Sequence, residues 1–380
     1  MQHLADYCRR NERWLVETIE AIVAIESPTD DKAAVDRCGA ELAARLRAIG
    51  GQVGSISTST AGDHLRVEFG RGDRQVLLLG HFDTVWPVGQ LARMPITRTD
   101  DRLTGPGVLD MKAGIVLGML ATRALFEAAG PPPSRVVMLW TTDEETGSRT
   151  SRALLEAEAR RSEAVLVLEP ALPGGVLKTS RKGCGQYEIV VYGEPAHAGV
   201  DPGKGVSAIR ELARQILAIE TMQDLPRGVS VNVGTIAGGT RPNVVAPEAR
   251  ATVDVRAPSR ADAERIDAQL RALTPQIAGA KIEVTGGFER PPMERTAGVA
   301  RLYAIAQQAG AELGQTIGEG STGGGSDGNF CAALGVPTLD GLGAIGDGAH
   351  ALHEHVLVPP LVPRAVLIAA LLSRLTSLRD

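Results

Sequence analysis

Polar residues that could bind metal ions follow several apolar segments of this chain. His81 and Asp83 come directly after the apolar run at 76–79, and Asp110 lies in the Gly-rich turn at 105–110. Further carboxylates and a late imidazole follow at Glu144, Glu145, Glu169 and His350. Imidazoles and carboxylates are typical zinc ligands, and a pair of zinc ions can activate water for hydrolysis. The residue types therefore indicate a candidate two-zinc hydrolase.

The first two candidates each have a simpler interpretation. His81 could be a structural histidine at the end of a strand. Asp83 favours the ligand interpretation, because a ligating imidazole usually donates its other ring N–H to a carboxylate. Asp110 could merely cap the helix that begins near Met111. As a ligand it would lie on rigid backbone and offer one oxygen to each of two zinc ions.

The acidic run at 143–145 could be a solvated loop. It follows an apolar strand at 136–140 and precedes Gly147, so its two glutamates can point in different directions. We expect Glu145 to bind metal and Glu144 to act as the general base toward the attacking water. Glu169 directly follows a third apolar strand and needs a metal or a salt bridge to offset its desolvation. Its local sequence leaves both open.

Three histidines lie close together near the end of the chain, at His350, His353 and His355. The residues alone do not choose among them. His350 follows the flexible segment at 346–348, which suits a loop that reaches a site. We expect His353 and His355 to flank that site or face solvent.

Composition describes an ordinary globular protein and excludes several classes. The chain has 380 residues, of which 43% are hydrophobic and 22% charged, and its net charge is -5. Acidity argues against a nucleic-acid binder, and an aromatic content of 3% disfavours stacking on single strands. The four cysteines are scattered without CxxC spacing, so we expect nitrogen and oxygen ligands for any metal.

The two ends of the chain give no sign of a membrane segment. Residues 1–10 carry charges without an apolar core, unlike a signal peptide, and the apolar run at 365–372 is too short to span a bilayer. We therefore expect a cytoplasmic protein, or a periplasmic one if a leader has been removed.

The expected elements place the candidate residues at one edge of a sheet. Apolar patterns predict helices within 12–49, a helix at 113–129, and strands at 76–79, 136–140 and 164–168. Strands that alternate with helices form a mostly parallel sheet in an α/β fold. Ligands of such sheets bind beyond the carboxyl ends of the strands, where His81, Glu145 and Glu169 fall.

A second, smaller domain is predicted at 183–289. Its elements follow the order strand, helix, strand, strand, helix, strand, which is the ferredoxin-like arrangement. It would be inserted into a catalytic domain formed by 1–182 and 290–380, which ends in a helix after Pro363.

These motifs, taken in order, resemble the M20 family of zinc peptidases and amidohydrolases, most closely its glutamate carboxypeptidase branch. The resemblance implies that His81, Asp110 and Glu169 hold one zinc. It likewise implies that Asp110, Glu145 and His350 hold the other, with Asp83 orienting His81 and Glu144 as the base. Co²⁺ or Mn²⁺ could substitute. Family members that act next to free carboxyl ends tend to have Glu at the position of Glu169.

The resemblance also assigns roles to the inserted domain as a lid and homodimer interface. It implies that His197 stabilises the oxyanion and that Asn243 and Arg290 grip the substrate carboxylate. Gly325 would line the substrate site. Lys178 lies where glutamate-specific relatives have Ser, and Val176 where they have Lys, so Lys178 is a candidate contact to an acidic side chain.

The sequence thus predicts hydrolysis of an amide bond next to a free α-carboxylate, in a peptide or an N-acyl amino acid. Release of a C-terminal glutamate is one form of this reaction. One alternative is a deacetylase or deacylase of a small N-acyl amino acid within the same family. A remote alternative is an inactive homologue that only binds ligands. We expect no nucleic-acid partner and no membrane partner.

Overall fold

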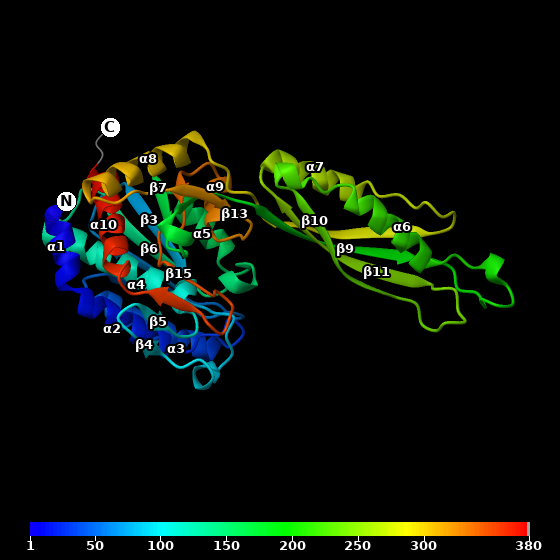
Figure 1. Ribbon diagram of the computed structural model, residues 1–380, viewed down its shortest axis with the longest axis horizontal. Coiled ribbons are helices and arrows are strands. Elements are labelled where there is room, and N and C mark those ends of the chain that lie inside the picture. Colours follow the sequence, from blue (N-terminus) through cyan, green and yellow to red (C-terminus); the bar gives the residue numbers. More distant parts are fainter. Residues whose placement is uncertain (378–380) are drawn as a thin grey trace. The chain divides into compact units, whose positions relative to one another are not determined.

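The computed structural model describes residues 1–377. The chain forms two compact units (Figure 1). Unit 1 comprises Met1–Thr179, Arg295–Ser321 and the chain from Ser326 onward. Unit 2 comprises Ser180–Glu294 and Thr322–Gly325. The predicted catalytic and inserted domains differ from these units at their edges, because residues 180–182, 290–294 and 322–325 pack with unit 2.

Unit 1 is built on a six-stranded sheet in the order β1-β2-β6-β3-β7-β14. Its strands are β1 (Gln52–Ile56), β2 (His64–Phe69), β3 (Gln75–His81), β6 (Arg135–Thr141), β7 (Ala164–Val167) and β14 (Thr338–Leu339). The four strands β6, β3, β7 and β14 run parallel, and β1 and β2 are antiparallel to their neighbours. The predicted mostly parallel sheet is confirmed.

Helices cover both faces of this sheet, so its central strands are apolar on both sides. Val76 and Leu78 of β3 pack in the core with α1 (Gln2–Arg10), α2 (Glu12–Val23), α3 (Lys32–Ala48), α4 (Ala113–Ala124), α8 (Ala297–Glu312) and α10 (Leu361–Ser377). Leu77 and Leu79 point to the other face and pack with α5 (Arg152–Arg160) and α9 (Gly328–Ala333). Every residue of β3 is buried as a result.

Close packing of α4 fixes the sheet edge that the candidate residues share. A Cβ atom at Gly114 would lie 2.0 Å from the carbonyl oxygen of Leu168, the residue before Glu169. Gly114 therefore allows α4 to approach the end of β7 at backbone contact distance. The predicted helix at 113–129 continues from α4 into a wider turn, Leu125–Ala129.

A second sheet in unit 1 joins segments that lie far apart in the sequence. It has the order β15-β16-β5-β4, formed by β4 (Thr97–Arg98), β5 (Arg102–Thr104), β15 (Gly346–Asp347) and β16 (His355–Leu357). β16 pairs antiparallel with β5, with His355 opposite Thr104. This pairing places the turn at 105–110 beside the segment at 350–354.

Unit 2 is a four-stranded antiparallel sheet covered on one face by two helices (Figure 1). Its strands are β9 (Gly183–Tyr192), β10 (Ser230–Gly238), β11 (Glu248–Ala257) and β12 (Lys281–Arg290), and its helices are α6 (Ala208–Glu220) and α7 (Arg260–Arg271). The order β10-β11-β9-β12 and the chain order confirm the ferredoxin-like prediction. β8 (Leu177–Arg181), which pairs with β13 (Glu319–Thr322), leads into this unit.

Across residues 1–377, no helix combines the length and the apolar character that crossing a bilayer requires. The segment at 365–372 lies inside α10, whose buried side chains pack in the core of unit 1.

Candidate metal centre

The structure brings five predicted ligands together at the carboxyl edge of the unit 1 sheet. His81 ends β3, and Glu169 follows β7. Glu145 lies in the turn Glu144–Thr146 that follows β6, and Asp110 lies in the turn Val108–Lys112 before α4. His350 lies between β15 and β16 and has a positive φ of 61°.

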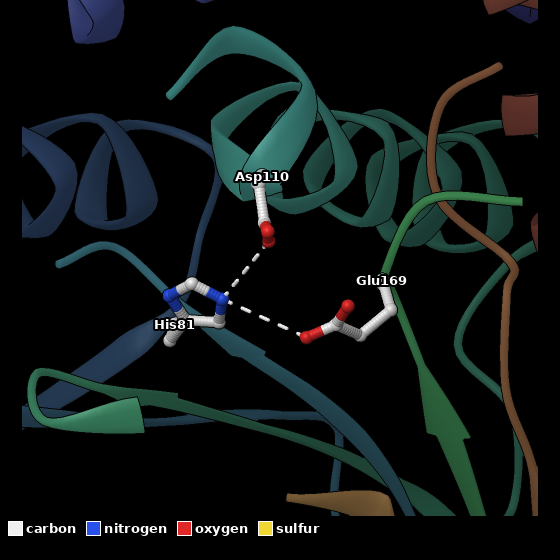
Figure 2. Close-up of side chains that lie close together, drawn as sticks. All are labelled: His81, Asp110 and Glu169. Atoms are coloured by element: carbon white, nitrogen blue, oxygen red, sulfur yellow. Dashed lines mark ion pairs between the residues drawn. The ribbon is translucent and has the colours of Figure 1, made fainter. Parts of the chain in front are cut away.

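The first group of ligand atoms surrounds His81 (Figure 2). Its Nε2 lies 3.3 Å from Oδ1 of Asp110 and 3.6 Å from Oε1 of Glu169. Both carboxylates point toward the same ring nitrogen. The ligand atoms that the three residues offer lie within 4.8 Å of one another, close enough to share one ion.

The second group surrounds His350 and uses the other oxygen of Asp110. Nε2 of His350 lies 3.4 Å from Oδ2 of Asp110 and 3.2 Å from Oε2 of Glu145. Asp110 thus presents Oδ1 to His81 and Oδ2 to His350, as a carboxylate that bridges two ions must do. The two groups share only this residue.

Unsatisfied polar atoms indicate that these residues suit a cation. Within the described part of the chain, Nε2 of His81, Oδ1 of Asp110 and Oε1 of Glu145 are buried without a hydrogen-bond partner. Buried polar atoms normally have partners, and a bound metal would supply one here. Two imidazole nitrogens and three carboxylates match the ligand preference of zinc and of similar divalent ions.

Electrostatics within the site favour protonated imidazoles in the absence of metal. Contacts with Asp110 and Glu145 raise the pKa of His350 to about 10. Burial lowers the pKa of His81, but its contacts with Asp110, Asp83 and Glu169 outweigh that effect and raise the pKa well above its usual value. Burial raises the pKa of Glu145. A bound cation would replace the imidazole protons, so metal binding must release protons.

Asp83 connects the first ligand group to the Glu144–Glu145 turn. Its Oδ1 lies 3.3 Å from Nδ1 of His81, on the ring edge opposite the ligand nitrogen. The backbone N–H groups of Glu144 and Glu145 donate to the same carboxylate at 3.4 and 3.2 Å. Thr29 adds a hydroxyl donor at 2.8 Å. The carboxylate is fully buried. Because it contacts both His81 and the turn that carries Glu144, it fixes the one relative to the other.

Two further residues, Asp143 and His64, form hydrogen bonds next to the Glu144–Glu145 turn that the sequence did not predict. Asp143 accepts hydrogen bonds from the backbone and the hydroxyl of Thr150 at 2.6 and 2.8 Å. His64 is buried, with Nε2 3.0 Å from the Thr150 hydroxyl and Nδ1 2.9 Å from the Thr142 hydroxyl. No local sequence signal marks His64, because it is the first residue of an ordinary alternating strand, β2.

The remaining histidines near the C-terminus differ in their surroundings. His353 is exposed, as expected. His355 is buried in β16, where it pairs with Thr104 of β5. Of its two expected placements, beside the site or facing solvent, the second is wrong. Glu354 between them is fully buried, although its polar neighbours suggest an exposed loop.

The predicted substrate residues lie in both units. Lys178 is buried in unit 1, where its backbone pairs with Asp340 through hydrogen bonds of 2.9 and 3.1 Å. In unit 2, Arg290 is buried next to the Gly-rich loop at 322–325, and a Cβ atom at Gly325 would lie 2.7 Å from its Cδ. Their roles as substrate contacts stay predictions.

His197 and Asn243 lie side by side within unit 2. The backbone N–H of Ala198 donates to the carbonyl of Asn243 at 2.9 Å. Nδ1 of His197 accepts the backbone N–H groups of Gly199 and Val200 at 3.1 and 3.2 Å. These bonds require a lone pair on Nδ1 and leave the ring proton on Nε2, on an exposed side chain.

Fold and site together define a metal-dependent hydrolase, and comparison with known proteins gives its family. Residues 77–374 match the model of peptidase family M20/M25/M40, and the chain belongs to that family. The predicted membership of the M20 family is confirmed, and so is the predicted fold, whereas the glutamate carboxypeptidase branch stays a prediction.

Individual relatives differ in what they act on. Carboxypeptidase G2 of Pseudomonas sp. (strain RS-16) is 30% identical over 368 residues, which cover 94% of this chain and 88% of that protein. The succinyl-diaminopimelate desuccinylase of Stenotrophomonas maltophilia (strain K279a) is 28% identical over 374 residues, covering 93% and 97%. A solved structure of a dinuclear metal-binding M20 peptidase from Bacillus subtilis superposes with a TM-score of 0.67 at 17% identity, covering 97% and 99%.

Proposed function

We propose that this protein is a dinuclear zinc hydrolase that cleaves the amide bond next to a free α-carboxylate. One observation carries the proposal: Asp110 turns its two oxygens toward two imidazoles, each of which has a further carboxylate beside it. Co²⁺ or Mn²⁺ could replace zinc, because the ligand set is of nitrogen and oxygen. Similarity to carboxypeptidase G2 over nearly the whole chain supports the substrate class.

The residues around the centre fit the steps of amide hydrolysis. Two bound zinc ions would polarise the carbonyl and lower the pKa of a bound water to about 7. Glu144, beside the ligand Glu145, would take the proton of the water and pass it to the leaving amine. His197 would donate its Nε2 proton to the developing oxyanion, which is a stabilisation that acts in the transition state.

Four residues are proposed to bind the substrate. Arg290 would hold the α-carboxylate through its guanidinium, and Asn243 would bind it through its amide. Gly325 would line the same site. Lys178 would contact an acidic side chain, so that a C-terminal glutamate would be a favoured leaving group. We further propose that unit 2 serves as lid and homodimer interface.

A deacylase of small N-acyl amino acids is the second candidate. It uses the same metal chemistry on a substrate with a short acyl group, and similarity to a succinyl-diaminopimelate desuccinylase favours it. The two candidates differ in which side of the amide the enzyme recognises.

Turnover of zinc-loaded protein on a panel of N-acyl amino acids and dipeptides tests both candidates. Dependence on the C-terminal residue would support the carboxypeptidase, and dependence on the acyl group would support the deacylase. Glu144→Ala serves as the inactive control and the exposed Glu188→Ala as the matched one. Full activity of Glu144→Ala, or a zinc-loaded wild type that cleaves no amide, would refute the proposal.

A further inference from the structure

Glu354 is a fully buried carboxylate that accepts hydrogen bonds from four N–H groups. Its Oε1 accepts the backbone N–H groups of Leu109 at 2.8 Å and of Asp110 at 3.1 Å. Its Oε2 accepts the indole N–H of Trp86 at 2.8 Å and the backbone N–H of Gly107 at 3.0 Å. Four donors on two oxygens can offset the cost of burying a charge.

These four donors belong to segments that carry the candidate ligands. Asp110, the shared carboxylate, is itself one of the donors through its backbone. Trp86 follows β3 on the segment that holds His81 and Asp83. Glu354 lies on the same short loop as His350, where its N–H donates to the carbonyl of Ala351 at 2.9 Å. One carboxylate therefore joins three chain segments at the centre.

Contacts of the backbone also hold the loop that carries His350 and Glu354. Strand pairing of β16 with β5 aligns the loop of His350 with the turn of Asp110. Gly348 packs so closely that a Cβ atom there would lie 2.9 Å from the backbone nitrogen of Glu354 and 2.8 Å from the ring of His353. The loop is thus held on one side by the sheet and on the other by the Glu354 bonds.

We infer that Glu354 is a positioning residue for the dinuclear centre. It fixes the backbone of Asp110 relative to His81 and His350, so that the shared carboxylate presents one oxygen to each group before metal binds. The inference rests on the metal centre proposed above. It requires a carboxylate, because a Gln amide would turn an NH₂ group toward two of the four N–H donors.

Zinc affinity of Glu354→Gln tests this role without reference to any substrate. Competition between the purified full-length protein and a chromophoric chelator measures zinc binding, and thermal unfolding of the zinc-free protein measures stability. We expect zinc to bind the variant about 10- to 100-fold more weakly, as is typical when a residue that supports a ligand is changed. We also expect kcat to fall more than KM rises, because the defect lies in the centre.

Glu211→Gln is the matched control. Glu211 is equally buried and accepts backbone N–H groups from Gln276 and Ile277 at 2.9 and 2.7 Å, but it lies on α6 of unit 2. This control should lose stability and keep the zinc affinity of the wild type. A merely structural role for Glu354 would give the same pattern in both variants.

The outcomes separate the inference from the proposed function. A wild type that binds no zinc refutes the proposed centre and the inference with it. A wild type that binds zinc, together with a Glu354→Gln variant of unchanged affinity, refutes only the inference. If Glu354→Gln does not fold, Trp86→Phe decides: it removes one of the four donors, and we expect about fivefold weaker zinc binding. Unchanged affinity in Trp86→Phe would overturn the inference.

Discussion

Nδ1 of His81 lies 3.3 Å from the carboxylate of Asp83, and both side chains are almost completely buried. This contact occupies the ring edge that faces away from Asp110 and Glu169. It therefore favours a proton on Nδ1, so that a metal ion displacing the Nε2 proton would meet the tautomer that a metal ligand needs. Since Asp83 also accepts from the turn of Glu144 and Glu145, it connects a proposed ligand with the proposed base.

Replacing Asp83 by Asn should weaken metal binding while leaving the side-chain volume unchanged. The neutral amide no longer stabilises the His81 ring, and its NH₂ group would face the N–H donors of the Glu144 turn. We expect zinc affinity to fall about 10- to 100-fold. Isothermal titration with zinc measures the change. The half-exposed Asp6→Asn is the control, and wild-type affinity in Asp83→Asn would refute the orienting role.

Replacing Glu144 by Gln should separate proton transfer from metal binding. Loss of a general base typically lowers kcat about 10²- to 10⁴-fold. Because Glu144 is not one of the ligand residues, the zinc content should stay that of the wild type. Steady-state kinetics and metal analysis of the same preparation check both parts. A variant that loses zinc along with activity would make Glu144 a ligand rather than the base.

Acid should destabilise the protein through His64. Burial lowers the pKa of this ring, although Asp143, Asp83, Asp327 and Asp63 act in the opposite direction. The unfolded chain therefore binds the proton more readily than the folded one. As the pH falls below the ordinary value of 6.5, His64 lowers the free energy of unfolding by at most about 1.4 kcal/mol per pH unit, until the folded ring also titrates.

Denaturant unfolding of His64→Gln between pH 7.5 and 5 checks this expectation. At neutral pH the variant should be less stable than the wild type, because it loses contacts to Thr142 and Thr150. The two stabilities should converge as the pH falls, since only the wild type contains the ring. A difference that stays constant over this range would contradict the prediction.

Arg364 should contribute to stability through carbonyl groups. It is 3% exposed, and its guanidinium donates to the carbonyls of Gly343 and Gly175 at 3.0 Å each and to that of Gly341. Arg364→Met would leave buried carbonyls unpaired, at a cost of about 1–3 kcal/mol for each one that water does not reach. Arg13→Met, on a largely exposed side chain, should change stability by less than about 0.5 kcal/mol. Equal effects in urea unfolding would contradict this role.

The sequence predicted the parts of the fold that hydrophobic patterns encode. β3, β6 and β7 are continuous apolar runs, and the candidate ligands that the pattern suggested lie at or just after their carboxyl ends. The helix α1 was not predicted, because charged residues interrupt its short apolar pattern. In the structure it packs against α10, and its buried residues are Leu4, Ala5, Tyr7 and Cys8.

Roles that depend on distant backbone could not be predicted in the same way. Glu354 stands between two histidines and resembles an exposed residue. Its role as an acceptor depends on the pairing of β16 with β5, which brings distant segments together. Glu354 and its donor Asp110, for example, are 244 residues apart in the sequence. The edges of the two units likewise depend on where β12 and the loop at 322–325 pack, which no local pattern shows.

The metal content of the purified protein tests the central claim most directly. Zinc-reconstituted wild type and Asp110→Asn would be dialysed and analysed for zinc per chain by mass spectrometry. We predict two ions for the wild type, and at most one for the variant, because an amide offers a single oxygen and cannot bridge. A wild type that holds fewer than two ions, or an Asp110→Asn variant that still holds two, would contradict the dinuclear centre.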